Sequence, residues 1–302
     1  MNWTPAIKGF QSYLLLERSL SPHSIEAYLR DVRKLYQFLQ LQGWELGPQE
    51  VTIDHLEAFI FQLNDLGLGA RSQARLLSGI KAFYRYLLME DLTDTDPTEL
   101  LEGPRLQRKI PEVLSYEEVS KILAAIDLSE PQGTRNRAML ETLYACGLRV
   151  SELTDLRISN LYLDINFIKV IGKNNKERIV PIGEEAVKHI QLYQEAVRRT
   201  QENMHPDHEN ILFLNRRGKK LSRVMVFNIV KQASRRAGIS KTVSPHTFRH
   251  SFATHLIEGG ADLKAVQDML GHESITTTEI YTHLDQDYLK DTIMTFHPRN
   301  KR

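Results

Sequence analysis

Hydrophobic residues recur every three or four positions through the first 90 residues of the chain. This period is typical of amphipathic helices and predicts four of them. Ser21 and Pro22 start the second helix, because serine caps a helix and proline fits its first position. Gly43 ends it. Nothing in this stretch alternates with the period of two expected of a half-buried strand. The predicted helices cover residues 5–17, 21–43, 52–66 and 70–89.

A connecting segment follows at residues 90–112, where three prolines interrupt the chain. Residues 90–102 hold six acidic side chains and no basic one, a composition typical of a solvated segment. We place a domain boundary near residue 105. The sequence therefore predicts a helical domain over 1–105 and a second domain over 106–302.

The second half of the chain combines helical patterns with a small β element. Ser115 and Glu118 form a capping-box pattern that starts a helix. Residues 166–171 and 177–182 are rich in β-branched side chains and flank the sequence GKNNK, which predicts a hairpin. Further helices are predicted at about 183–199, 222–237, 246–258, 262–270, 274–283 and 285–294.

Length and composition exclude several classes of protein. A chain of 302 residues with 41% hydrophobic and 25% charged residues is expected to fold, as two domains or as one. Its longest apolar run is five residues, 122–126, and its first residues lack the pattern of a signal peptide, so we expect a cytoplasmic location. A single cysteine, Cys146, excludes an internal disulfide and a cysteine-rich metal site. The net charge of +1 by itself gives no support to a nucleic-acid partner.

Local charge tells more than the total. Residues 66–89 contain four basic side chains and no acidic one, and on a helix all four fall within an arc of about 120°. A phosphate-facing surface is one interpretation, and an ordinary solvated face is the other. The four bases are Arg71, Arg75, Lys81 and Arg85.

Chemically capable residues are scattered through the second half. His246 and Arg249 are three residues apart on a predicted helix and can address one phosphate. His246 with His250 also has zinc-ligand spacing, but the glutamate of HExxH is missing, so we do not expect a zinc site. Taken one at a time, residues of these kinds are more often ordinary surface or packing residues. The remaining candidates are Arg149, which follows a helix break, Lys173 at the hairpin tip, His272 after Gly271, and Tyr281.

Together these residues stand in the sequence words GLRVSEL, VIGKNNKERIVPIG, SPHTFRHSFATHL and LGHESITTTEIYTH. In order and wording the chain resembles the tyrosine recombinase (phage integrase) family, and within it the Xer branch, over essentially its whole length. The resemblance implies a mainly α, two-domain protein. A four-helix core-binding domain and a mixed α/β catalytic domain with a small antiparallel sheet would form a C-shaped clamp on DNA.

The resemblance also assigns roles to the six catalytic positions. Tyr281 is implied to be the nucleophile that forms a 3′-phosphotyrosine, and Lys173 the general acid for the leaving 5′-oxygen. Arg149 and Arg249 would clamp the non-bridging oxygens, as fork-shaped guanidiniums can. His246 would handle the tyrosine proton, and His272 would donate to the phosphate. We expect no metal and no cofactor, and the sequence contains no GxxxxGK[ST] motif for ATP.

The same resemblance implies an assembly and a biological role. We expect a homo- or hetero-tetramer on double-stranded DNA with a short, imperfectly palindromic site, working through a Holliday junction. The C-terminal helix, about residues 285–296, would dock on a neighbouring copy. A second Xer recombinase and an FtsK-type translocase are possible partners, and chromosome-dimer resolution at a dif-like site is the expected role. The alternatives are a mobile-element integrase, a type IB topoisomerase and a DNA-binding protein that no longer cuts.

Overall fold

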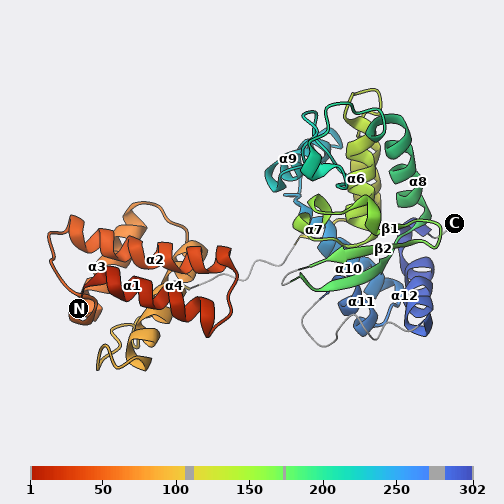
Figure 1. The fold of residues 1–302 in the computed structure, drawn as a ribbon. Coiled ribbons are helices and arrows are strands. Elements are labelled where there is room, and N and C mark those ends of the chain that lie inside the picture. Colours follow the sequence, from red (N-terminus) through yellow and green to blue (C-terminus); the bar gives the residue numbers. More distant parts are fainter. Residues whose placement is uncertain (1, 106–111, 173–174, 272–282, 301–302) are drawn as a thin grey trace. The chain divides into compact units, whose positions relative to one another are not determined.

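The computed structural model describes residues 2–105, 112–172, 175–271 and 283–300; of residues 283–287 it describes the backbone alone. The chain divides into two compact units, Met1–Lys109 and Ile110–Arg302, which are described separately below (Figure 1).

The N-terminal unit contains the four predicted helices, which are confirmed. They pack around an apolar core that includes Phe10, Leu35, Ile80 and Phe83, all fully buried. The Ser21 hydroxyl accepts the backbone N–H of Ser24 at 3.3 Å, which is the predicted cap. The helices are α1 (Trp3–Leu16), α2 (Pro22–Leu41), α3 (Ile53–Asp65) and α4 (Ala70–Met89).

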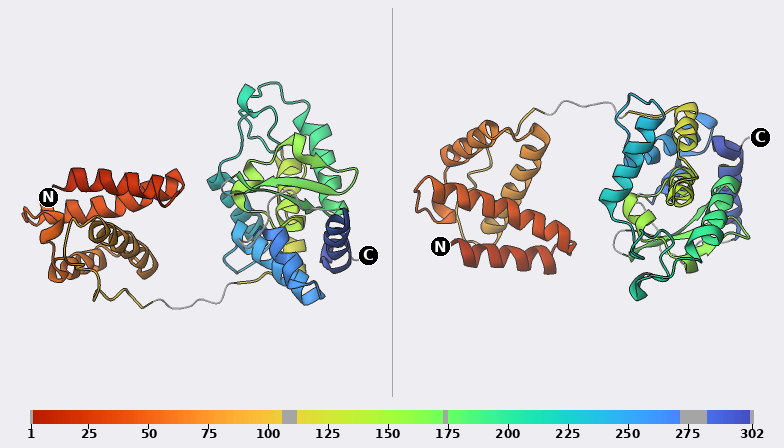
Figure 2. Two further views of the ribbon diagram at one scale, coloured as in Figure 1. Left: turned by 60° about the horizontal axis from the view of Figure 1, so that its bottom comes forward. Right: turned by 90° about the horizontal axis from the view of Figure 1, so that it is seen from above.

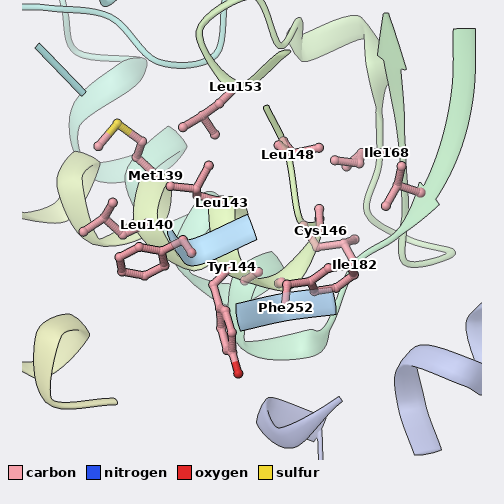
Figure 3. Packing of buried hydrophobic residues seen from close by; sticks show 14 of the residues in the cluster. Met139, Leu140, Leu143, Tyr144, Cys146, Leu148, Leu153, Ile168, Ile182 and Phe252 are labelled. Carbon is pink, nitrogen blue, oxygen red and sulfur yellow. The ribbon is translucent and has the colours of Figure 1, made fainter. Parts of the chain in front are cut away.

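The C-terminal unit is built around one buried helix, α6, which runs through its middle (Figure 2). Met139, Leu140, Leu143 and Tyr144 of this helix lie inside the core, together with Phe252 from a later helix (Figure 3). The unit's helices are α5 (Tyr116–Ala124), α6 (Gly133–Ala145), α7 (Val150–Thr154), α8 (Glu184–Tyr193), α9 (Arg223–Arg236), α10 (Pro245–Gly259), α11 (Leu263–Leu270) and α12 (His283–Phe296).

The predicted hairpin is confirmed and belongs to a three-stranded antiparallel sheet. Strand β2 (Phe167–Ile171) pairs with β3 (Glu177–Pro181) on one side and with the short β1 (Leu161–Tyr162) on the other. A strand of two residues has too little alternation to be seen in a sequence, which is why β1 was not predicted.

Several predicted helix ends differ from the structure. The helix predicted at 183–199 is α-helical only to Tyr193 and continues as a π turn over Gln194–Arg198. The helix predicted at 274–283 falls almost entirely outside the described residues.

No helix in the described parts of the chain is long and apolar enough to cross a membrane.

The end of the chain packs against its own C-terminal unit. Leu289 and Ile293 of α12 belong to the core of this unit. Beyond α12, the ring of His297 lies 4.8 Å from that of Tyr144, and its Nδ1 accepts the backbone N–H of Arg299 at 3.3 Å. The Arg299 guanidinium in turn pairs with the buried carboxylate of Glu141. In this single chain, residues 288–300 therefore contribute to the folding of the unit that carries them.

Candidate functional site

The break between α6 and α7 places Arg149. Gly147 adopts the left-handed conformation, with φ of +56°, and a Cβ at this position would clash with the Phe252 ring. The tight turn lets the chain leave the buried helix and re-emerge at Arg149, the N-cap of α7. The Arg149 side chain is 36% exposed, so it can reach a ligand.

Glu152, one turn further along α7, organises the site. One of its oxygens accepts the backbone N–H of Arg149 at 2.7 Å, and the other lies 2.9 Å from the Arg149 guanidinium. Arg178 of β3 donates to both oxygens, at 2.8 and 2.9 Å. Arg249 of α10 lies 3.8 Å away. A single buried carboxylate thus gathers three arginines from three different elements.

Arg249 is held from the opposite side by backbone carbonyls. Ser244 caps α10 and Pro245 begins it, while Phe248, Phe252 and Leu256 are fully buried along one side, as their spacing predicts. The Arg249 guanidinium donates to the carbonyls of Gly147 and Leu270, each at 2.7 Å. Arg249 is therefore not an ordinary surface residue, since only 8% of it is exposed.

The three arginines also share the end of α11. Asp262 caps the start of this helix and Gly271, with φ of +63°, ends it. The last carbonyls of a helix have no partner within it and carry partial negative charge. Arg178 donates to the Met269 carbonyl at 2.8 Å, Arg249 to that of Leu270 at 2.7 Å, and Arg149 to that of Gly271 at 3.2 Å.

Burial and charge work against each other in this cluster. Burial, together with the charge of neighbouring Arg149, lowers the pKa of the Arg249 guanidinium, which remains a cation at neutral pH. Burial raises the pKa of Glu152, but the hydrogen bonds and charge of Arg178 outweigh it and hold this pKa below its ordinary value. The site therefore holds three cations around one anion, and its positive excess suits a phosphate.

The other predicted catalytic residues are placed differently. His246 stands exposed on the first turn of α10, while Arg249 of the same helix is buried. Lys173, His272 and Tyr281 lie outside the described residues. The described parts of the chain contain no group of three or more His, Cys, Asp or Glu side chains arranged to hold a metal ion.

Sequence reasoning missed Glu152 and Arg178. Both stand within the motif words already quoted, and Glu152 follows Arg149 at helical spacing, which was a usable signal. Nothing local marked Arg178, because its partners are distant in sequence.

The cationic face of α4 is less free than its sequence predicts. Arg71 and Arg85 are exposed. Arg75 pairs at 2.8 Å with Asp31 of α2, a carboxylate that is 2% exposed, and Lys81 donates to the Leu101 carbonyl at 2.9 Å. Burial raises the pKa of Asp31, although Arg75 opposes it. A helical wheel drawn for one helix cannot show an acid that its neighbour supplies.

A second cationic surface lies on α9 and was not predicted. This helix carries no acidic residue, and three of its large apolar side chains are exposed to solvent: Val224 at 69%, Phe227 at 43% and Met225 at 39%. Exposed apolar groups among cations are typical of a surface that meets a partner. The exposed polar residues of α9 are Arg223, Asn228, Lys231, Gln232, Arg235 and Arg236. Of these, Arg236 pairs with Glu130 at 2.8 Å.

The fold and the arginine cluster agree with comparisons to known proteins. Residues 112–287 match the model of the phage integrase family, and residues 7–91 match the phage integrase N-terminal SAM-like domain. The chain belongs to this family and is a tyrosine recombinase, an enzyme that breaks and rejoins DNA strands.

Its curated relatives include proteins named tyrosine recombinase XerD. The one from Chlorobaculum tepidum is 44% identical over 98% of this chain and 97% of its own length. The one from Staphylococcus saprophyticus is 42% identical over 97% of this chain and 98% of its own. The chain is thus XerD-like.

Solved structures give the same fold. The XerA recombinase, at 30% identity, has a TM-score of 0.50 and is matched over 98% of this chain and 99% of its own. A lambda integrase tetramer bound to a Holliday junction, at 17% identity, has a TM-score of 0.71, with 97% of this chain and 78% of that chain covered. The XerH recombinase bound to its difH substrate, at 23% identity, has a TM-score of 0.66. The match covers 83% of this chain and 74% of that chain.

Proposed function

We propose that this chain recombines DNA at a short, imperfectly palindromic site, through a 3′-phosphotyrosine on Tyr281 and a Holliday junction. The role we propose is resolution of chromosome dimers at a dif-like site in the cytoplasm. The observation that carries the proposal is the pair of guanidiniums of Arg149 and Arg249, held by one carboxylate and one helix end. Two forks fixed together can bind both non-bridging oxygens of a phosphate.

The reaction needs charge stabilisation and two proton transfers. The Tyr281 oxygen attacks phosphorus, the bond from phosphorus to the 5′-oxygen breaks, and Arg149 and Arg249 stabilise the charge of the transition state. Because a phenol with a pKa of about 10 is about 0.1% ionised at pH 7, a base must take its proton. His246, exposed on α10, is our candidate for it. Lys173 protonates the leaving 5′-oxygen, and His272 donates to the phosphate.

Two cationic surfaces support DNA binding. The exposed face of α9 combines cations and amides with apolar groups, which suits the edges of bases as well as phosphates. On α4 we propose Arg71 and Arg85 as direct phosphate contacts. Arg75 and Lys81 would have to exchange their present partners for DNA.

The assembly is also a proposal. Related recombinases have been solved on DNA as a dimer and as a tetramer, and we propose a homo- or hetero-tetramer here. A second Xer recombinase and an FtsK-type translocase are the partners we would test.

Covalent capture tests the function. The protein is incubated with nicked fragments of its host DNA in EDTA, the reaction is stopped with SDS, and attached DNA is sequenced. Adducts at one short, imperfect palindrome are expected with the wild type, and none with Tyr281→Phe, which should still bind DNA. Adducts scattered over all sequences would instead indicate a type IB topoisomerase. An adduct formed by Tyr281→Phe would refute the choice of nucleophile.

A further inference from the structure

Arg178 lies at the centre of the arginine cluster, and all three of its guanidinium nitrogens are bonded to protein groups. Its side chain is 7% exposed, and its strand position on β3 faces Val170 of β2. Through Nη1, Nη2 and Nε it reaches both oxygens of Glu152 and the Met269 carbonyl, all within 2.9 Å. One side chain thus ties the hairpin to α7 and to the end of α11.

Two glycines pack against this ion pair. A Cβ added at Gly271 would lie 3.1 Å from Cδ and Nη1 of Arg178. A Cβ added at Gly172 would lie 3.5 Å from the Glu152 carboxylate and 3.6 Å from Arg178 Nη1. Gly172, at the end of β2, and Gly271, at the end of α11, therefore both rest on the pair formed by Arg178 and Glu152.

The balance of charge gives Arg178 a specific task. Glu152 has two oxygens, and Arg178 takes one position on each. Without Arg178, the single negative charge would be shared only by Arg149 and Arg249. Both guanidiniums would be drawn toward the carboxylate and away from a bound phosphate, and the Met269 carbonyl would lose its donor.

We propose that Arg178 is a positioning residue for strand cleavage, which fixes Glu152 and the end of α11 so that Arg149 and Arg249 meet the scissile phosphate in productive geometry. This inference rests on the proposed function.

Single-turnover cleavage of a nicked duplex carrying the captured site tests it. Arg178→Gln is expected to form the covalent adduct about 100-fold more slowly, the loss typical of a misplacement of about 1 Å. Its affinity for the duplex should stay that of the wild type, because the guanidinium nitrogens of Arg178 are all bonded to protein groups. The acid limb of the cleavage rate should move to higher pH, since Glu152 loses the cation that lowers its pKa. The charged groups facing Glu152 are then Arg149 of α7 and Arg249 of α10.

A double variant separates positioning from simple loss of structure. Glu152→Gln adds one positive charge to the cluster and Arg178→Gln removes one, so the double variant has the wild-type charge. We expect it to cleave about 10-fold faster than Arg178→Gln alone, which corresponds to about 1.4 kcal/mol in activation free energy, and the rate of Glu152→Gln alone completes the double-mutant cycle. Losses that simply add would contradict the inference.

Arg198→Gln is the matched control. Arg198 is also buried in the C-terminal unit and also donates to carbonyls, those of Glu209 and Ile211, but it is not bonded to the cluster. The Arg198→Gln variant should have a lower melting temperature than the wild type, but its folded form should cleave at the wild-type rate.

If Arg178→Gln does not fold, Arg178→Lys tests whether Arg178 is a positioning residue. Lysine keeps the charge but cannot bind both oxygens and the carbonyl together, so cleavage should fall by about 10-fold. Wild-type cleavage by a folded Arg178→Lys or Arg178→Gln would overturn the inference. Failure of the wild type to form any adduct would overturn the proposed function instead.

Discussion

Replacing His297 with asparagine should change how the stability of the C-terminal unit depends on pH. His297 is 1% exposed. Burial, and then the neighbouring His255 and Arg299, lower its pKa from 6.5 to about 3. Because Nδ1 accepts the Arg299 N–H, protonating that nitrogen would cost a hydrogen bond and bury a charge. Asparagine can offer an acceptor at a similar position and does not titrate.

The size of the effect follows from the two pKa values. Between pH 6.5 and 3 the unfolded chain binds a proton at His297 that the folded chain does not. Stability therefore decreases as the pH falls through this window, by about 1.4 kcal/mol per unit. From pH 7.5 to 5.0 the wild type should lose about 2 kcal/mol relative to His297→Asn. At pH 7.5 the variant should be less stable by about 2 kcal/mol, because the smaller side chain leaves a cavity. The two proteins should thus become equally stable near pH 5.

Urea titrations of the full chain at a series of pH values measure this. Trp3 and Trp44, the two tryptophans of the sequence, both lie in the N-terminal unit, so their fluorescence follows that unit alone. Far-ultraviolet ellipticity follows both units, and the difference between the signals isolates the C-terminal one. The tryptophan transition should be the same in both proteins at every pH.

An unchanged stability difference between pH 7.5 and 5.0 would refute the reasoning. It would mean that His297 titrates alike in the folded and unfolded chains, and hence that the packing of residues 297–300 is not maintained in solution.

Three further predictions concern other parts of the chain. Arg149→Ala and Arg249→Ala should each slow adduct formation by about 10²- to 10³-fold, because each removes one donor from the transition state, while a gel-shift titration should show binding largely kept. Arg71→Ala should reduce the slope of log affinity against log salt by about 0.9, the value for one phosphate contact. Arg75→Ala should change that slope less. It should instead destabilise the N-terminal unit by about 1–3 kcal/mol, because the buried Asp31 loses its partner. Ser115→Ala should destabilise the C-terminal unit by about 1 kcal/mol in a urea titration, since the Ser115 hydroxyl accepts the N–H of Glu118 at 3.2 Å and caps α5; a loss of under 0.2 kcal/mol would contradict that role for the cap.

Much of the fold could be predicted because its signals are local. Each helix of the N-terminal unit carries its own hydrophobic period and its own punctuation, as Ser21 and Gly43 show for α2. The hairpin was visible because β-branched runs flank a short polar turn. Local signals also explain the errors: β1 has two residues, and the π turn after Tyr193 keeps a helical pattern of side chains.

The site could be predicted only as a set of residue types in order. The resemblance predicts roles for Arg149 and Arg249, but no local signal shows that both lie against the same carboxylate, since that depends on contacts over about 100 residues of chain. Arg178 and the pairing of Arg75 with Asp31 were missed for the same reason. Ion pairs between different helices or strands depend on the tertiary fold. The sequence pattern of a single helix therefore cannot predict them.

The three carbonyls at the end of α11 have a consequence for the energy of the chemical step. Fixing an arginine side chain costs about 1.5–2 kcal/mol of conformational entropy. Arg149 and Arg249 are already immobilised on Gly271 and Leu270 without DNA. That entropic cost is therefore met during folding and not when substrate binds. In the reaction we propose, the barrier to cleavage then reflects chemistry and the approach of DNA, with no contribution from ordering these two cations.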